Sequence, residues 1–300
     1  MLKRLFACCL MLFAWPAHAA LNVFACEPEW AALARELGGD RVSTYEATTA
    51  LQDPHRIQAR PSLIARARTA DLVVCTGADL EVGWLPMVLR QAANPNVQPG
   101  RPGYFEAASF VPLLEVPERL DRAEGDVHPR GNPHIQLDPR NLSRVAEALA
   151  ARMGELDGAN RAHYQARLAD FRSRWQAAIA RWEQQGAPLR GMPVAVHHKV
   201  FTYLFHWLGL KEVAVLEPKP GIEPSAAHLA AVLEDLKRQP ARMVLRASYQ
   251  DERASQWLAE RAGIPAVALP ATVGGTPEAR DLMGLFDDIL NRLLAAQGRR

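Results

Sequence analysis

Apolar positions in the first half of the chain fall into two alternating patterns. Strands are expected at 21–26, 42–47 and 71–75, and the last of these is an almost wholly apolar run. Helix starts are indicated by Pro28, by Pro61 and by the pair Asp138-Pro139, and apolar residues after the first and last of these are spaced three or four apart. A run without polar alternation suits a parallel sheet that is covered on both faces. Strands alternating with helices therefore predict an α/β layer fold.

The longest periodic segment runs from about residue 160 to residue 185. Its apolar stripe is largely aromatic and consists of Tyr164, Leu168, Phe171, Trp175, Ile179 and Trp182. A helix of this length would be about 39 Å long at 1.5 Å per residue. We interpret the stripe as core packing rather than a cofactor site, and the helix as a backbone that joins two lobes.

The second half repeats the pattern of the first. Strands are expected at 192–196, 213–216, 243–245 and 266–269, and helices at 201–208, 225–236, 251–262 and from Thr276-Pro277 onward. The chain therefore predicts two Rossmann-like α/β lobes with parallel sheets, joined by a long backbone α-helix. We expect the lobes at 20–158 and 187–300 and the joining helix at 159–186. A ligand would lie between the lobes.

The first nineteen residues have the features of a cleaved signal peptide. Lys3–Arg4 is a basic start, Leu5–Trp15 is apolar, and Ala17–Ala19 gives the small-x-small pattern before a cut. The apolar run is too short for the ~20 residues of a membrane-spanning helix, and Cys8 and Cys9 lie too early for a lipid anchor. We therefore predict cleavage after Ala19 and an exported, periplasmic protein.

Composition excludes several classes of protein. The chain of 300 residues is 49% hydrophobic with a net charge of +2, which argues against disorder. No Lys/Arg-rich run is present, so we expect no nucleic-acid partner. Four cysteines are too few for a disulfide scaffold, and after cleavage only Cys26 and Cys75 would remain, either bridged or as two buried thiols. Sequence motifs for a phosphate loop, a serine-hydrolase elbow or an H-E-x-x-H zinc helix are absent.

Several histidines lie in loops or at strand ends, where ligands of open α/β sheets bind. His55 follows the strand at 42–47, His134 precedes the helix begun by Asp138, and His197 and His198 end the strand at 192–196. Three neutral imidazoles that converge from separate units could bind a borderline metal such as Zn²⁺. We expect the helical histidines to be surface or packed residues, and these are His163, His206 and His228.

Four motifs, in order, resemble a known family. They are Gln52-Asp53-Pro54-His55 with Pro61-Ser62, Ala70–Val74 followed by Gly77 and Leu80-Glu81, Pro133–Pro139, and His198 with Phe201, Tyr203, Leu204 and Gly209-Leu210. Together they resemble the periplasmic metal-binding proteins of zinc and manganese ABC importers, the cluster A-I solute-binding family. The resemblance implies metal ligation by His55, His134 and His198, with His197 less suited because adjacent strand residues point to opposite faces. It also implies an ABC permease as partner, and we expect a monomer that is not an enzyme.

The resemblance places Cys26 and Cys75 near the ends of neighbouring strands, where a structural bridge is plausible. The family's late carboxylate ligand has no match here, since the corresponding segments, 245–250 and 269–274, contain no Asp or Glu. Asp251, Glu252 or water could take the fourth position, and a three-histidine site favours Zn²⁺ over Mn²⁺.

Two other functions are kept as alternatives. One is an exported zinc hydrolase with three histidine ligands, and the other is a protein of the same fold that binds an organic metal chelate. A short acidic loop carries Glu124, Asp126 and His128. It is a remnant of the family's His/Asp/Glu-rich loop and could be an auxiliary capture site, but we expect a solvated surface loop.

Overall fold

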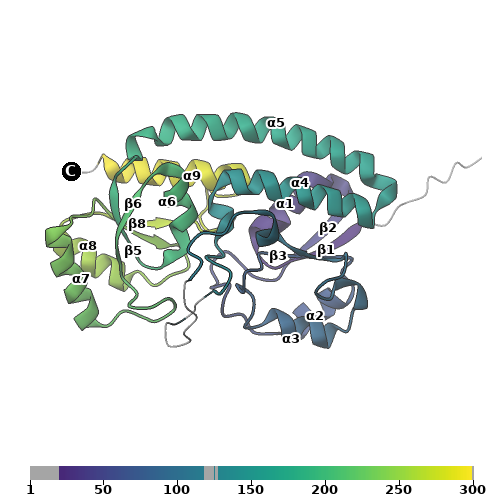
Figure 1. The fold of residues 1–300 in the computed structure, drawn as a ribbon, viewed down its shortest axis with the longest axis horizontal. Helices are drawn as coiled ribbons and strands as arrows, with labels where there is room; N and C mark the ends of the chain where they lie inside the picture. The colour runs from purple at the N-terminus through teal and green to yellow at the C-terminus, as the bar shows by residue number, and fades with distance from the viewer. Residues whose placement is uncertain (1–19, 118–124, 126–127, 299–300) are drawn as a thin grey trace, which may run out of the picture.

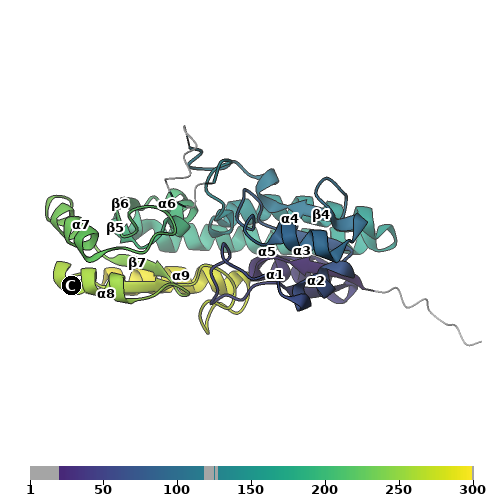
Figure 2. The same cartoon turned by 90° about the horizontal axis from the view of Figure 1, so that it is seen from below.

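The computed structural model describes residues 20–117, 125 and 128–298, and these form two α/β lobes side by side (Figures 1 and 2). The predicted signal peptide lies outside the described residues, as do Glu124 and Asp126. Within the described part of the chain, no helix is long and apolar enough to cross a membrane. The two-lobed α/β architecture predicted from the sequence is confirmed.

The first lobe contains a parallel sheet in the order β2-β1-β3-β4. Its strands are β1 (Leu21–Ala25), β2 (Val42–Glu46), β3 (Leu72–Cys75) and β4 (Tyr104–Glu106). Its helices are α1 (Pro28–Gly38), α2 (Pro61–Arg68), α3 (Leu85–Ala92) and α4 (Pro139–Leu156). Neither α3 nor β4 was predicted from the sequence, and a three-residue strand is too short to show a pattern.

Strand β3 is buried on both faces, as its apolar run predicted. Leu72 and Val74 pack into the core that α1 and α4 cover, whereas Val73 and Cys75 pack into a second core under α2 and α3. This alternation follows from the two-residue period of a strand. The carboxyl end of β1 lies at the edge that faces the other lobe, where Glu29 accepts a hydrogen bond from Thr272.

The second lobe repeats this topology, with the parallel order β6-β5-β7-β8. Its strands are β5 (Pro193–Val196), β6 (Lys211–Val215), β7 (Val244–Ala247) and β8 (Ala266–Leu269), and its helices are α6 (Thr202–Leu208), α7 (Ala226–Arg238), α8 (Arg253–Ala262) and α9 (Leu282–Gln297).

The predicted start of the last helix at Thr276-Pro277 is wrong. The helix begins at Leu282, because Asp281 is its N-cap and accepts a hydrogen bond from the Gly284 amide at 2.7 Å. Thr276 instead donates to Asp288 at 2.6 Å, which holds the preceding loop against the helix.

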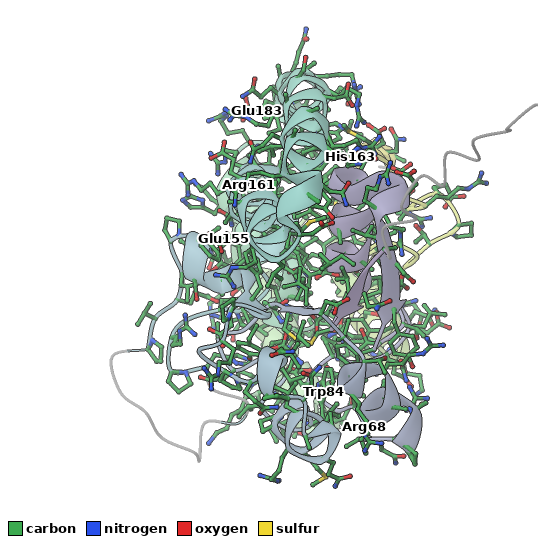
Figure 3. All side chains as sticks on the ribbon, turned by 90° about the vertical axis from the view of Figure 1, so that its right-hand side faces the viewer. Arg68, Trp84, Glu155, Arg161, His163 and Glu183 are labelled. Atoms are coloured by element: carbon green, nitrogen blue, oxygen red, sulfur yellow. A yellow bond between two sulfur atoms is a disulfide. The ribbon has the colours of Figure 1, made fainter. Side chains whose placement is uncertain are left out.

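Helix α5 (Arg161–Gly186) extends across both lobes, close to the predicted 160–185 (Figures 1 and 2). Its first half is bonded to α1 through His163, whose ring nitrogen lies 2.8 Å from the Gly38 carbonyl oxygen. Its second half is bonded to α9, where the Trp182 indole donates to Asp287 at 2.6 Å. Figure 3 labels His163 on this helix, far from Trp84 and Arg68 at the other side of the molecule. The aromatic stripe is core packing, as expected, and Trp175 and Trp182 are fully buried.

A disulfide joins Cys26 and Cys75, which follow β1 and end β3 in the first lobe. Their Cα atoms are 4.8 Å apart, and both residues are fully buried. The bridge implied by the resemblance is therefore present, and it ties two adjacent strands together next to the interlobe edge. Since the two sulfur atoms are bonded to each other, neither offers a thiolate to a metal.

Candidate metal site

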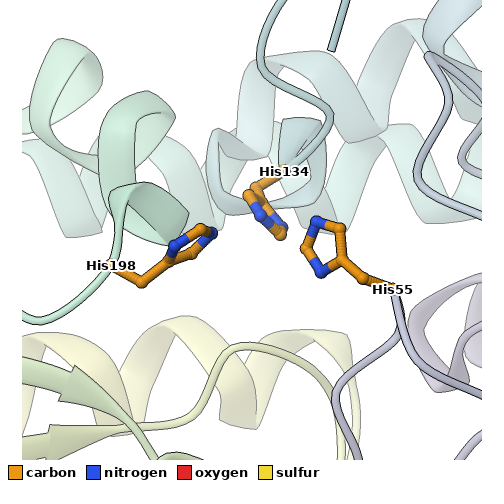
Figure 4. A group of neighbouring side chains, drawn as sticks. All are labelled: His55, His134 and His198. Carbon is orange, nitrogen blue, oxygen red and sulfur yellow. The ribbon is translucent and has the colours of Figure 1, made fainter. Parts of the chain in front are cut away.

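Three imidazoles converge between the lobes (Figure 4). His55 comes from the loop after β2, His134 from the segment that leads into α4, and His198 from the turn after β5. Each contributes one ring nitrogen to a group whose nitrogen atoms all lie within 4.8 Å of one another. The ring centroids are 5.4 Å apart for His55 and His134, 5.9 Å for His55 and His198, and 5.8 Å for His134 and His198. The structure thus brings together the three histidines singled out in the sequence.

Carboxylates orient two of these imidazoles. The Nδ1 atom of His55 lies 2.7 Å from Asp53, and the Nδ1 atom of His198 lies 2.7 Å from Glu217. A carboxylate accepts the Nδ1 proton, so the Nε2 lone pair of each ring is left for another partner. This carboxylate–histidine pairing is the usual support of a metal-ligating imidazole.

His134 is the most buried of the three, with 2% of its surface exposed. Its Nε2 atom is buried, and among the described residues no hydrogen-bond partner is within reach. Burial, reinforced by the neighbouring His55, His198 and His128, lowers the pKa of His134 well below 6.5. A neutral imidazole with an unused nitrogen is chemically ready to bind a cation.

The pKa of Asp53 is lowered as well, but by hydrogen bonding rather than by burial. Burial alone would raise the pKa of Asp53, but its hydrogen bonds to the side chain and backbone of His55 bring the pKa below 3.8. The carboxylate is therefore ionised at neutral pH and holds the Nδ1 proton of His55 in place.

Hydrogen bonds close the two lobes around the imidazoles. Arg56 of the first lobe donates to the Gly221 carbonyl at 2.7 Å, and Gln136 donates to the Ala271 carbonyl at 3.1 Å. Glu29 on α1 accepts a hydrogen bond from Thr272, which follows β8. Arg56 directly follows His55 and Gln136 lies two residues after His134, so these bonds hold the two lobes together beside the imidazoles.

The remaining candidates lie outside the group of three. The Nε2 atom of His197 lies 3.9 Å from Glu217, and burial lowers the pKa of His197. Asp251 accepts hydrogen bonds from Arg253, and Glu252 pairs with Arg246 at 3.0 Å. Both carboxylates considered for the fourth position are thus engaged by arginines.

The other histidines do not join the three either. His163 contacts Gly38, while His206 and His228 lie on α6 and α7. His128 is a special case, because its Nε2 atom lies 3.2 Å from the Nε2 atom of His55.

Glu217 was not identified from the sequence, although a signal was available. It comes one residue after the apolar run 213–216, at the carboxyl end of β6. Strand β6 is the neighbour of β5, which ends just before His197 and His198. A side chain at that position can therefore reach the histidines, because parallel strands end at the same edge.

Removal of the Glu217 carboxylate should weaken metal binding without unfolding the protein. We expect Glu217→Ala to reduce Zn²⁺ affinity by about 10–100-fold, the usual effect of losing such a support. Glu217→Gln should lose less Zn²⁺ affinity, since its amide oxygen can still accept a hydrogen bond from His198 Nδ1. Competition titration with a chelating dye measures both variants, with Glu234→Ala on the exposed face of α7 as control. Equal affinity of Glu217→Ala and wild type would exclude this role.

A cluster of buried carboxyl groups lies beside the disulfide at the interlobe edge. Glu81 accepts from the Thr76 amide at 2.8 Å, and Glu27 accepts from the Thr76 hydroxyl at 3.2 Å. Burial raises the pKa of Glu81 and of Glu29 to about 7. Burial, followed by the charges of Glu81 and Glu29, raises the pKa of Glu27 well above 4.5.

These raised pKa values predict how stability depends on pH. A raised carboxyl pKa means that the folded state binds protons more tightly than the unfolded chain does. The protonated carboxyl groups therefore contribute their full stabilisation of the fold below about pH 4.5, and this stabilisation is lost as pH rises through the folded pKa. Glu27→Gln keeps an acceptor for Thr76 and removes the charge facing Glu81. We expect it to stabilise the protein at pH 8 by on the order of 1–3 kcal/mol and to change little at pH 4. Urea unfolding at both pH values measures this, with the exposed Glu260→Gln as control, and an equal effect at both would contradict it.

Two α/β lobes, one connecting helix and an imidazole cluster between the lobes define a bilobed metal-binding protein of the cluster A-I type. Residues 23–296 match the model of one family, described as zinc-uptake complex component A, periplasmic (ZnuA). The chain belongs to this family.

Curated relatives include proteins named for zinc and for manganese. The high-affinity zinc uptake system protein ZnuA of Bacillus subtilis is 23% identical over 248 residues, which cover 81% of this chain and 76% of that protein. The manganese ABC transporter substrate-binding lipoprotein PsaA of Streptococcus pneumoniae is 21% identical, with 79% and 74% covered. The zinc-binding lipoprotein AdcA of S. pneumoniae is 24% identical over 75% of this chain, but the chain spans only 44% of its length.

Solved structures show the same fold. A crystal structure of ZnuA superposes with a TM-score of 0.76 at 23% identity and covers 93% of this chain and 100% of its own. The Mn-bound periplasmic metal-binding protein from Candidatus Liberibacter asiaticus superposes with a TM-score of 0.74 at 15% identity, with 92% and 99% covered.

Proposed function

We propose that this protein binds one divalent transition-metal ion between its lobes and delivers it to the permease of an ABC transporter. His55, His134 and His198 would be its ligands, each through Nε2. The observation that carries this proposal is the convergence of three imidazoles from both lobes, two of them oriented by carboxylates and the third with a buried, unused nitrogen. Family membership supports the same function.

The donor set favours Zn²⁺ over Mn²⁺ as the cargo. Imidazole nitrogens suit zinc at Zn–N distances of about 2.0–2.1 Å, whereas manganese prefers carboxylate and water oxygens. The two carboxylates nearest the cluster, Asp53 and Glu217, accept hydrogen bonds from imidazoles at Nδ1. They therefore support the nitrogen ligands and leave the ligand set rich in nitrogen.

We further propose that the protein acts outside the cytoplasm, as a periplasmic monomer exported by a signal peptide cleaved after Ala19. Relatives named as lipoproteins or as a periplasmic component support a location outside the cytoplasm. Delivery to a permease would need the lobes to separate, and the interlobe hydrogen bonds of Arg56, Gln136 and Thr272 are the contacts that would break.

Binding without catalysis fits the cluster better than a zinc hydrolase. A hydrolase needs a general base beside a metal-bound water, but Asp251 and Glu252 are held by Arg253 and Arg246. An organic chelate fits less well than a bare ion, because ring nitrogens within 4.8 Å of one another leave room for a single ion between them.

Metal analysis of the purified protein tests the proposal. We expect about one zinc per chain after expression without added metal, retention of zinc through dialysis, and preference for Zn²⁺ over Mn²⁺ in competition. The variant His206→Ala, altered on the exposed side of α6, should behave like wild type. Metal-free protein that does not take up added Zn²⁺ would exclude this function, and turnover of esters or peptides by the zinc form would favour the hydrolase.

A further inference from the structure

We propose that His128 is a fourth nitrogen ligand of the same ion, in place of the carboxylate that the family usually supplies. The inference rests on the proposed function, and it concerns the specificity of that site. Its starting point is the distance of 3.2 Å between the Nε2 atoms of His128 and His55. In a tetrahedral zinc site with Zn–N distances of about 2.0–2.1 Å, two ligand nitrogens are about 3.3–3.4 Å apart. The two imidazoles already have this spacing.

The backbone around His128 is built to deliver the side chain to the site. The Gly131 amide donates to the His128 carbonyl at 3.0 Å and closes a turn. Gly131 has φ of +116°, and a Cβ atom there would come within 2.7 Å of the Leu114 carbonyl oxygen, so the turn needs a glycine. Three residues later the same segment supplies His134.

Hydrogen bonds tie this segment to the second lobe. The Asn132 carboxamide oxygen accepts from the His134 amide at 3.0 Å, and its nitrogen donates to the Lys199 carbonyl at 2.8 Å. Lys199 directly follows His198, so one asparagine links the segment carrying His128 and His134 to the segment carrying His198. His128, His134 and His198 also line one cavity, together with Asn132 and Lys199.

His128 contacts His55 most closely and is not part of the group whose nitrogens all lie within 4.8 Å. Its ring centroid is 5.2 Å from that of His55. A small rotation of its side chain toward the cavity that it shares with His134 and His198 would complete a tetrahedron of four Nε2 atoms. Because manganese prefers oxygen donors, a fourth imidazole in the oxygen position would favour zinc further.

Zinc X-ray absorption and competition titration of wild type and His128→Gln test this inference. Wild type loaded with one Zn²⁺ should show four imidazoles, and His128→Gln should show three plus an oxygen. Zinc affinity should fall by about 10–100-fold, less than for loss of one of the other three ligands because an oxygen takes the vacant position, and the preference for Zn²⁺ over Mn²⁺ should narrow. His206→Gln, the same change on the exposed side of α6, should match wild type in all three measurements.

The outcomes separate this inference from the proposed function. Three imidazoles in wild type, with an unchanged spectrum and affinity in His128→Gln, would overturn the role of His128 and leave the three-histidine site intact. Failure of wild type to bind zinc would overturn the proposed function and, with it, this inference.

Discussion

Replacing His134 with alanine is expected to lower Zn²⁺ affinity by more than about 100-fold, since losing a ligand should exceed the 10–100-fold effect of losing its support. His134 is the most buried of the three imidazoles, and its Nε2 atom has no other use within the described structure. Its lowered pKa also means that no proton has to leave this ring at neutral pH before the ion binds. Competition titration at pH 7.5 measures the change.

Thermal unfolding separates lost ligation from lost folding. Metal-free His134→Ala should unfold cooperatively near the temperature of metal-free wild type, because the turn at Asn132 and the helix cap at Asp138 use other atoms. Excess Zn²⁺ should raise the melting temperature of wild type but not of the variant, as expected for a ligand that binds only the folded state. Zinc-induced stabilisation of the variant equal to that of wild type would remove His134 from the site.

Loss of the Cys26–Cys75 disulfide is expected to cost about 2–4 kcal/mol of unfolding free energy. The bridge closes a loop over a sequence separation of 49 residues, and removing such a constraint gives the unfolded chain more freedom. The double variant Cys26→Ala/Cys75→Ala is preferred to a double serine variant, because a serine hydroxyl would be buried without a hydrogen-bond partner at these fully buried positions. Urea unfolding of wild type and of the variant measures the difference.

Reduction of wild type provides the matched comparison. Dithiothreitol should shift the urea midpoint of wild type toward that of the double variant and leave the variant unchanged. Metal affinity of the folded variant should be retained, because the bridge lies within the first lobe and none of the three imidazoles contacts it. A wild-type midpoint that is unaffected once mass spectrometry shows both thiols free would contradict the prediction.

Local patterns were sufficient for most elements of the fold. The helices at Pro28, Pro61 and Pro139 begin where proline and capping residues place them, and the α5 stripe is buried as its period indicates. The last helix was misplaced because Thr276-Pro277 resembles a helix start, while the actual cap at Asp281 depends on the loop that precedes it. The short strand β4 has no periodic hydrophobic signal, and it forms by parallel pairing with β3.

Some features of the candidate site could likewise be predicted from the sequence, whereas others are seen only in the structure. Position beside strand ends and helix starts narrowed the histidines to a few, and the resemblance of their motifs to a known family selected His55, His134 and His198. Glu217 was missed although it follows a predicted strand, and neither its contact with His198 nor the approach of His128 to His55 could be predicted, because these contacts join residues separated by 19 and 73 positions. Such contacts depend on strand order and on how the lobes meet, and no spacing in the chain encodes either directly.

The sequence alone determined that this chain has two α/β lobes, one long joining helix and three histidines placed for convergence, because hydrophobic period, proline and capping residues act locally. The tertiary structure alone decided which nitrogen of each ring faces the others, which carboxylates orient them and that Asp251 and Glu252 are engaged by arginines. Those features depend on distances of a few ångströms between segments that are remote in the chain, and only packing of the two lobes fixes such distances.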